Sequence, residues 1–497
     1  MQANLLIPVD YPLLTVITFL PLVGGLILLL MRGERLIRWT SLLTTVVTLT
    51  VALPLLSDFD KSTYHMQFVE THPWIAAWGI EYAVGVDGIS VLFVVLAALL
   101  SVLCVAVSWR AIDIRVKEFF LALLIMETAM IGVFVSLNLF LFYVFWELML
   151  IPMFLLIGVW GGPNRVYAAV KFVLFTLAGS VFMLVGIIVL VQTAGGTFDF
   201  QALAETTLPA NLQLWLFFAF FAAFAVKVPM FPLHTWLPDA HTEAPTAGSV
   251  ILAGILLKMG AYGFIRLSLP LFPDAVRSLL VPMLVLSVAA VIYGAYVTLT
   301  QSDLKRLIAY SSVSHMGFVT LGIFTISRAG VEGGILQMIN HGIVTGALFL
   351  CVGIIYERTH SREIEDYGGL SRLAPVFTTF FAIFCLAAIG MPGMNTFIGE
   401  FLVISAAFRI GAIYGALAIV GVLLGVTYMC WLFYRMVLRK ITPKMEETVF
   451  DLGPREVLLL APLVVLVFLI GVQPELVLSY MHTSVEHLLG QMGAVGP

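Results

Sequence analysis

The chain of 497 residues is 61% hydrophobic and only 11% charged, with a formal net charge of -4 at neutral pH. Ordinary soluble domains carry roughly 25% charged residues, so this composition excludes a typical soluble enzyme and indicates an integral membrane protein surrounded by a lipid bilayer. The lysines and arginines form no basic cluster of the kind that binds nucleic acid, so we expect no nucleic-acid partner.

Apolar runs close to twenty residues long predict fourteen membrane-spanning helices, because each run is long enough to cross a bilayer. In chain order the runs lie at about 11–31, 36–56, 87–109, 117–136, 138–158, 167–192, 212–228, 244–266, 275–300, 303–325, 332–356, 374–408, 412–438 and 456–473. The first run follows Asp10 rather than a basic residue, which favours a retained helix over a signal peptide. We therefore expect an all-α, multi-pass membrane protein.

Two of the predicted helices are broken by proline. The seventh ends beside Pro229 and Pro232, and the twelfth is interrupted at Pro392-Gly393. Proline removes a backbone donor and clashes with the preceding turn, and the freed carbonyls inside a membrane need protein or water as partners. Broken membrane helices are typical of ion pathways in transporters.

Most of the 25 lysines and arginines fall in alternate connections between the predicted helices. Because cytoplasmic connections are enriched in these residues, that side is predicted to be cytoplasmic. Both termini and the long connection 57–86 then face the periplasmic side of a bacterial inner membrane. At the end of this connection, Asp87 is expected to act as the N-cap of the third helix.

Four cysteines lie in apolar runs and form no CxxC pair: Cys104, Cys351, Cys385 and Cys430. This pattern argues against an iron-sulfur or zinc site, so we expect no metal or cofactor bound by this chain.

Ionisable residues recur at matching places in two five-helix units. The first unit carries Glu147, Lys171 and Lys227, and the second carries His315, His341 and Glu400. Five is an odd number of crossings, so the two units are expected to be inverted repeats, at 117–270 and 271–440. They are flanked by segments 1–116 and 441–497. Lys258, in the eighth helix, has no ionisable counterpart in the thirteenth.

A charge at the centre of a membrane helix costs roughly 2.5 to 3.5 kcal/mol on insertion scales, so buried charges need a partner, water or a function. Alternating carboxylates, amines and imidazoles are what a proton relay requires, and burial allows lysine to become a neutral acceptor. Structural alternatives remain open: a buried hydrogen bond for Glu147, snorkelling for Lys227, an interface anchor for Lys171, and ordinary core positions for the histidines. Further candidates, for proton uptake or for capping and turns, are Glu127, His234, Asp239, His241 and Glu243.

Four stretches of the chain resemble the antiporter-like subunits of respiratory complex I, the type I NADH:quinone oxidoreductase. They are Ala225-Val-Lys-Val-Pro through Lys258, Phe145-Trp-Glu147, Asp303-Leu-Lys-Arg through Gly317, and Gly85-Val-Asp-Gly-Ile-Ser90. This family is related to multisubunit cation/proton antiporters and to membrane subunits of some hydrogenases. The stretch Met391-Pro-Gly through Glu400 is similar to the type that carries glutamate rather than lysine on the broken twelfth helix. The 24 residues after position 473 leave no room for the long lateral helix of one sister subunit.

The resemblance implies a proton-translocating subunit in which Glu147 and Lys227 are the coupled pair of a first half-channel. It implies that Lys258 is the central relay lysine, that Glu400 ends the second half, and that His315 and His341 connect them. NADH, FMN, iron-sulfur clusters and quinone would belong to other subunits, and sister antiporter-like subunits would flank this chain on both sides. Two alternatives stay open: a subunit of a cation/proton antiporter, and a scaffold whose buried charges only fix packing.

Overall fold

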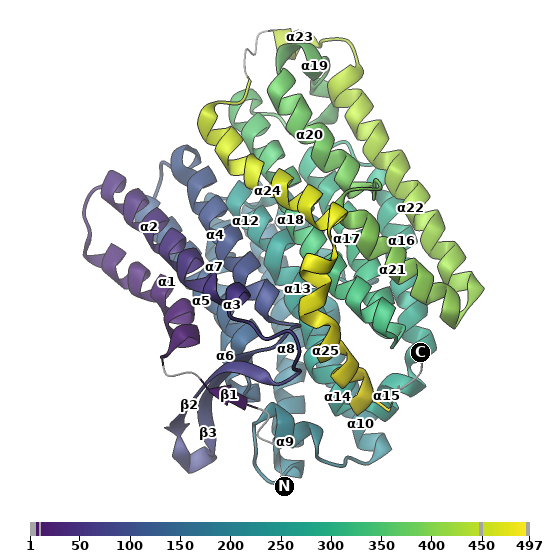
Figure 1. Ribbon diagram of the computed structural model, residues 1–497. Helices are drawn as coiled ribbons and strands as arrows, with labels where there is room; N and C mark the ends of the chain where they lie inside the picture. Colours follow the sequence, from purple (N-terminus) through teal and green to yellow (C-terminus); the bar gives the residue numbers. More distant parts are fainter. Residues whose placement is uncertain (1–5, 9–10, 447–450, 494–497) are drawn as a thin grey trace.

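The computed structural model of the chain describes residues 6–8, 11–446 and 451–493. Long helices run side by side in an elongated bundle (Figure 1). One end, which we call the hairpin end, carries strands β1 (Leu6–Pro8), β2 (Met66–Ile75) and β3 (Ile80–Val86) and helix α25 (Glu475–Gln491). The opposite end, which we call the basic end, carries α19 (Leu370–Leu373) and α23 (Pro443–Glu446).

The prediction of fourteen crossings is confirmed. Among the residues that the structure describes, thirteen helical spans are long and apolar enough to cross a membrane, and the pair α20 and α21 supplies the fourteenth. The first seven spans are α1 (Leu13–Leu30), α2 (Glu34–Ala52) with α3 (Pro54–Ser57), α4 (Val91–Ala111), α5 (Val116–Val135), α6 (Leu139–Leu148) with α7 (Leu150–Trp160), α8 (Arg165–Thr193) and α10 (Ala210–Lys227). The remaining seven are α12 to α14 (Thr246–Leu271), α16 (Leu280–Leu299), α17 (Leu304–Phe324), α18 (Arg328–Thr359), α20 (Pro375–Ala388) with α21 (Asn395–Ile410), α22 (Ala412–Phe433) and α24 (Pro454–Val472).

Both predicted breaks are present. Helix α10 ends at Lys227, and the chain resumes a helix only at α11 (Trp236–Glu243), after Pro229 and Pro232. Between α20 and α21, Gly390 and Gly393 adopt positive φ angles of 70° and 88°, which glycine accommodates at little cost. The breaks follow from the residues themselves, because two closely spaced prolines remove backbone donors after α10 and left-handed glycines leave the helical conformation after α20.

Two spans that the sequence predicts as regular helices are irregular. The fifth is interrupted at Met149, between α6 and α7, because Pro152 cannot donate to the carbonyl of Leu148. The eighth contains two π-helical turns, η2 (Leu252–Leu256) and η3 (Phe264–Ser268), on either side of α13 (Leu257–Gly263). Pro270 has no N-H for the carbonyl of Arg266, which accounts for the irregular turn at η3.

The predicted all-α architecture has one exception, at the connection 57–86. Strands β2 and β3 form an antiparallel hairpin through the left-handed Gly79, and β1 pairs in parallel with β2. Aromatic and β-branched residues such as Val69, Tyr82 and Val84 favour these extended strands. The strand β1 and the helix α25 lie at the same end of the bundle, so an even number of crossings separates them.

The predicted N-cap of the third span is displaced by one turn. Helix α4 begins at Val91 with Ser90 in the N-cap position, which corrects the prediction that Asp87 fills it. Asp87 does accept backbone N-H groups, from Ile89 and Ser90 at 3.1 Å each, and so holds the turn that leads into the helix.

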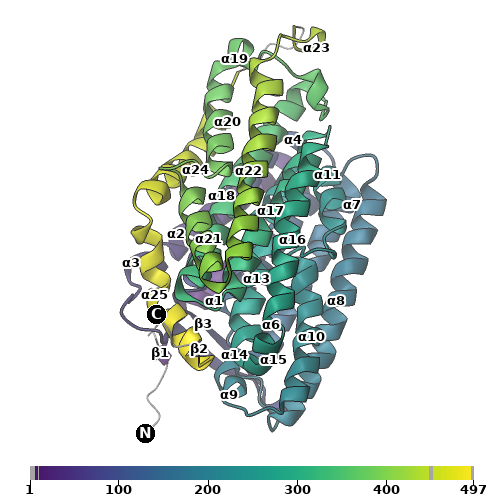
Figure 2. The same cartoon turned by 90° about the vertical axis from the view of Figure 1, so that its right-hand side faces the viewer.

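The interior of the bundle is formed mainly by α18, whose central 18-residue stretch is fully buried, and by α17 and the eighth span. Figure 2 shows α8 and α10 at one edge of the bundle and α24 at the opposite edge. Lys258, His315 and His341 therefore sit on central helices, whereas Lys171 and Lys227 lie on α8 and α10 at the edge of the bundle.

Candidate functional site

Lys258 lies at the centre of the molecule, on α13, and its side chain is fully buried. Its ammonium group donates to the carbonyl of Ala253, which belongs to the π-helical turn η2. The same nitrogen lies 2.6 Å from Nδ1 of His341 on α18. π-Helical turns are frequent at functional sites because they shift backbone groups out of the regular ladder. Here the turn supplies an acceptor for a buried charge.

A second imidazole, that of His315, lies close to His341. The ring centroids of His341 and His315 are 5.9 Å apart, and His315 comes from α17. A small cavity of about 10 Å³ lies beside both rings and is also lined by Gln337 and Thr396. A space of this size, with polar walls, accommodates about one water molecule. The two rings are therefore within reach of each other through a single water.

Glu400, on α21, ends this series. Its Oε1 lies 3.4 Å from Nδ1 of His315, an ion-pair contact whose angles fall short of a hydrogen bond. Gln337 donates to the same oxygen at 3.4 Å. A Cβ atom at Gly390 would lie 2.7 Å from Oε2 of Glu400, so the break between α20 and α21 leaves space for the carboxylate. We call the series Lys258, His341, His315 and Glu400 the polar line.

The first unit is arranged differently. Lys227 is buried at the end of α10, and its ammonium lies 5.0 Å from the centre of the Trp146 ring. Glu147, half-buried in the last turn of α6, acts electrostatically on Lys227, but the described residues show no direct ion pair between them. Glu147 and Lys227, which are expected to be a coupled pair, thus interact electrostatically without forming an ion pair in this structure.

Lys171 pairs with a residue of the helix break. Its ammonium lies 2.7 Å from Oδ2 of Asp239, and both side chains are 21% exposed. Arg306 lies 3.9 Å from the other oxygen of Asp239. This geometry supports a structural link between α8, α11 and α17, the alternative left open for Lys171. Glu243 likewise accepts the backbone N-H of Asn164 at 2.9 Å, as a capping residue would.

Three other buried ionisable groups have incomplete hydrogen bonding. His241, stacked on Phe349 at 4.7 Å, and His234 have no hydrogen-bond partner for either ring nitrogen within the described ranges. Glu127 is completely buried on α5, and neither of its carboxylate oxygens meets a donor among the described residues. The structure leaves these residues as candidates outside the polar line.

Lys305 is a buried lysine that the sequence reasoning did not single out. Its position at the start of α17, next to Asp303 and Arg306, is that of a loop charge. In the structure it is only 6% exposed and donates to the carbonyl of Ala244 at 2.6 Å. It lines a cleft of about 400 Å³ at the basic end, together with Arg110, Glu243, Glu357 and Arg362. Only the tertiary contact of Lys305 with Ala244, the residue that follows α11, identifies it as a buried lysine.

Within residues 6–8, 11–446 and 451–493, no group of three or more His, Cys, Asp or Glu side chains is placed to hold a metal ion. The four cysteines are free, and Cys430 is exposed whereas the other three are buried.

A family model described as "NADH:quinone oxidoreductase/Mrp antiporter, TM" matches residues 136–425. The chain is 48% identical over 495 residues to NADH-quinone oxidoreductase subunit M of Rhodobacter capsulatus, covering 96% of both chains. It is 46% identical over 483 residues to NADH-ubiquinone oxidoreductase chain 4 of Marchantia polymorpha, covering 96% of this chain and 97% of the relative. The fold superimposes on a chain of respiratory complex I from Thermus thermophilus with bound NADH, with a TM-score of 0.89, 32% identity, and coverage of 97% of this chain and 100% of the other.

Proposed function

The chain belongs to the NADH-quinone oxidoreductase subunit M family, the proton-translocating, antiporter-like subunits of the complex I membrane arm, and on this premise we propose that the polar line carries its protons. The glutamate on the broken twelfth helix agrees with this subunit type, which is called chain 4 in the plant relative. The full-length likeness to these oxidoreductase subunits favours complex I over the alternative of a separate cation/proton antiporter.

The observation that carries the proposal is the chain of contacts from Lys258 to Glu400. The distance is 2.6 Å from the lysine to the first imidazole and 3.4 Å from the second imidazole to the carboxylate. Three different helices and one broken helix contribute these groups, so their meeting is a property of the fold. If the charges served only to fix packing, titratable groups would not need to alternate along the series.

Each group in the polar line can both accept and release a proton. Lys258 gives its proton to Nδ1 of His341 and becomes a neutral amine, which burial favours. The imidazole of His341 then releases a proton from Nε2, which has no other partner among the described residues. A water in the small cavity passes it to His315, and Nδ1 of His315 delivers it to Glu400. Imidazole is suited to such steps because its two nitrogens exchange roles.

In this proposal, Glu147 and Lys227 of the first unit act on Lys258 through their charges. Glu147 and Lys227 change their mutual attraction when either side chain moves, and this alters the charge that Lys258 experiences. Lys171 acts through its ion pair with Asp239 and has the smaller part.

We propose a bacterial inner membrane location, with the basic end cytoplasmic and the hairpin end periplasmic. The excess of lysine and arginine in connections at the basic end supports this orientation. The proposed units remain 1–116, the inverted repeats 117–270 and 271–440, and 441–497. The chain has no redox centre of its own: NADH, FMN, iron-sulfur clusters and quinone are bound by other subunits of the complex, and sister antiporter-like subunits lie on both sides.

The test is Glu400→Gln in the intact complex, reconstituted in proteoliposomes. Glutamine keeps the size and hydrogen bonding but cannot titrate, so NADH-driven proton pumping should fall sharply. NADH oxidation by an artificial acceptor should be unchanged, which reports that the complex has assembled. Glu400→Asp still titrates and should retain part of the activity.

Glu118→Gln, at an exposed position near the start of α5, is the matched control. Equal pumping by Glu400→Gln and the control would show that Glu400 is a packing residue, and the proposal would then fail.

A further inference from the structure

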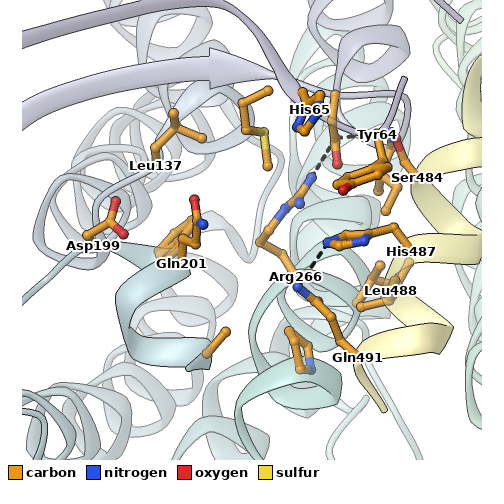
Figure 3. A pocket seen from close by; sticks show the side chains of 17 residues that line it. Tyr64, His65, Leu137, Asp199, Gln201, Arg266, Ser484, His487, Leu488 and Gln491 are labelled. Carbon is orange, nitrogen blue, oxygen red and sulfur yellow. Dashed lines mark hydrogen bonds and ion pairs between the residues drawn. The ribbon is translucent and has the colours of Figure 1, made fainter. Parts of the chain in front are cut away.

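A cavity of about 120 Å³ opens at the hairpin end, between segments that are far apart in the sequence. We call it the hairpin-end cavity. It is lined among others by Tyr64, Asp87, Asp199, Arg266, Ser484 and His487. Figure 3 shows Arg266 extending between the α25 residues on one side and Gln201 on the other. The cavity lies over the outer end of the helix that carries Lys258.

Arg266 closes the inner side of this cavity. Its guanidinium donates to Oδ1 of the buried Asp87 at 2.5 Å, and its Nε donates to the Tyr262 hydroxyl at 3.1 Å. Arg266 lies eight residues after Lys258 on the same helical span, a rise of roughly 12 Å. The ion pair therefore lies about two turns above the central lysine, between it and the cavity.

An aromatic layer lies beneath the ion pair. The buried Tyr262 packs edge-on against Phe134 at 5.2 Å, and Phe134 stacks on Phe93 at 5.1 Å. The Tyr262 hydroxyl donates to the carbonyl of Phe134 at 3.4 Å. Between Lys258 and Arg266, Tyr262 carries the one polar side chain of the helix.

The direction of these hydrogen bonds stops an inward proton. A relay group must accept a proton on one side and release one on the other, but arginine has only donors and is not deprotonated in proteins. The Tyr262 hydroxyl accepts from Arg266 and donates to a carbonyl, which is an acceptor only. Along the eighth span, as far as the described residues show, Arg266 and Tyr262 thus offer a proton in the cavity no acceptor that leads to Lys258.

Other titratable groups that line the cavity include His65, Asp199 and His487. His487 stacks on Tyr64 at 3.9 Å, and burial lowers the pKa of its imidazole. Ser484 accepts the backbone N-H of Gly88 at 3.1 Å, which ties α25 to the turn that holds Asp87. Helix α25 thereby fixes the carboxylate that orients Arg266.

We propose that Arg266, held by Asp87 and Tyr262, seals Lys258 against the return of protons from the hairpin end. Protons then leave along the polar line toward Glu400 and not directly outward along the eighth span. This inference rests on the proposed function, in which Lys258 carries a proton, and it adds the device that prevents a short circuit.

The test measures passive proton flux in proteoliposomes that contain the intact complex, without NADH, after an acid pulse at the hairpin end. Arg266→Gln removes the donor-only group and should raise the flux several-fold, and Arg266→Lys should also raise it above wild type, because a buried lysine can lose its proton whereas arginine cannot. Arg277→Gln is the matched control, because Arg277 also lies at the hairpin end, where it bonds to the carbonyl of Met492.

The double variant Arg266→Gln with Lys258→Met identifies the route. Loss of the extra flux in the double variant would show that protons return through Lys258, whereas flux that persists would reveal a general packing defect and overturn the inference. Wild-type flux in Arg266→Gln would also overturn it. Neither result would disturb the proposed function if Lys258→Met alone still abolishes pumping, so the two failures can be told apart.

Discussion

The two proposed five-helix units place ionisable residues at matching positions but join them differently. In the second unit, His315 and Glu400 are in contact, and His341 reaches Lys258 directly. In the first unit, Glu147 and Lys227 interact only at longer range, and Lys227 rests over the Trp146 ring. The comparison teaches that a repeated pattern of residue types does not by itself give a connected path. The second unit needs one water, between His341 and His315, to complete its series, whereas Lys227 and Glu147 need a side-chain movement before they touch.

The largest effect is expected at Lys258, which belongs to the first unit and contacts His341 of the second. Lys258→Arg keeps a positive charge, but arginine does not lose its proton in proteins, so transfer to His341 should stop. We expect pumping to fall about 100-fold, the scale of a lost acid-base group. NADH-driven acidification of proteoliposomes measures it. Near-normal pumping would mean that Lys258 acts as a fixed charge and that the polar line begins elsewhere.

Lys227→Ala tests the first unit. Glu147→Gln should reduce pumping by the same factor if the two residues act as a pair. Both variants remove one of the two charges, so pumping should fall by between about tenfold and 100-fold on the same scale. The double variant should be no worse than either single change, because coupled residues are not additive. Additive losses, measured by the same proteoliposome assay, would show that these residues work independently.

A smaller loss of proton pumping is expected for His315→Gln in the second unit. Glutamine preserves hydrogen bonding to Glu400 but cannot carry a proton, and a water in the adjoining cavity partly replaces it. Pumping should fall about tenfold or less, below the usual range for losing an acid-base group. A loss as large as that of Lys258→Arg would show that no water bypasses the ring.

The smallest effect is expected for the ion pair of Lys171 and Asp239. The pair is half-buried, so Lys171→Met should change stability by on the order of 1 kcal/mol. Thermal inactivation of the purified complex, compared for Lys171→Met, Asp239→Asn and the double variant, measures the coupling. A collapse of pumping without loss of stability would place Lys171 in the relay after all.

The sequence by itself determined the membrane spans, the two breaks and the identity of most buried charges. These properties are local. An apolar run of about twenty residues crosses a bilayer, and a proline such as Pro229 or Pro392 removes a backbone donor at its own position. The family motifs added the roles expected of Glu147, Lys227, Lys258 and Glu400. Nothing beyond the order of residues was needed for these predictions.

Only the tertiary structure decided which of these groups meet. His341, not His315, contacts Lys258, and Lys171 pairs with Asp239. Lys305 is buried although its neighbours in sequence are loop charges. Such contacts depend on the rotation and depth of helices that are 60 to 180 residues apart, and a shift of one residue turns a side chain by about 100° around its helix. Hydropathy fixes how deep a helix lies, but only packing against its neighbours fixes which way each charge points.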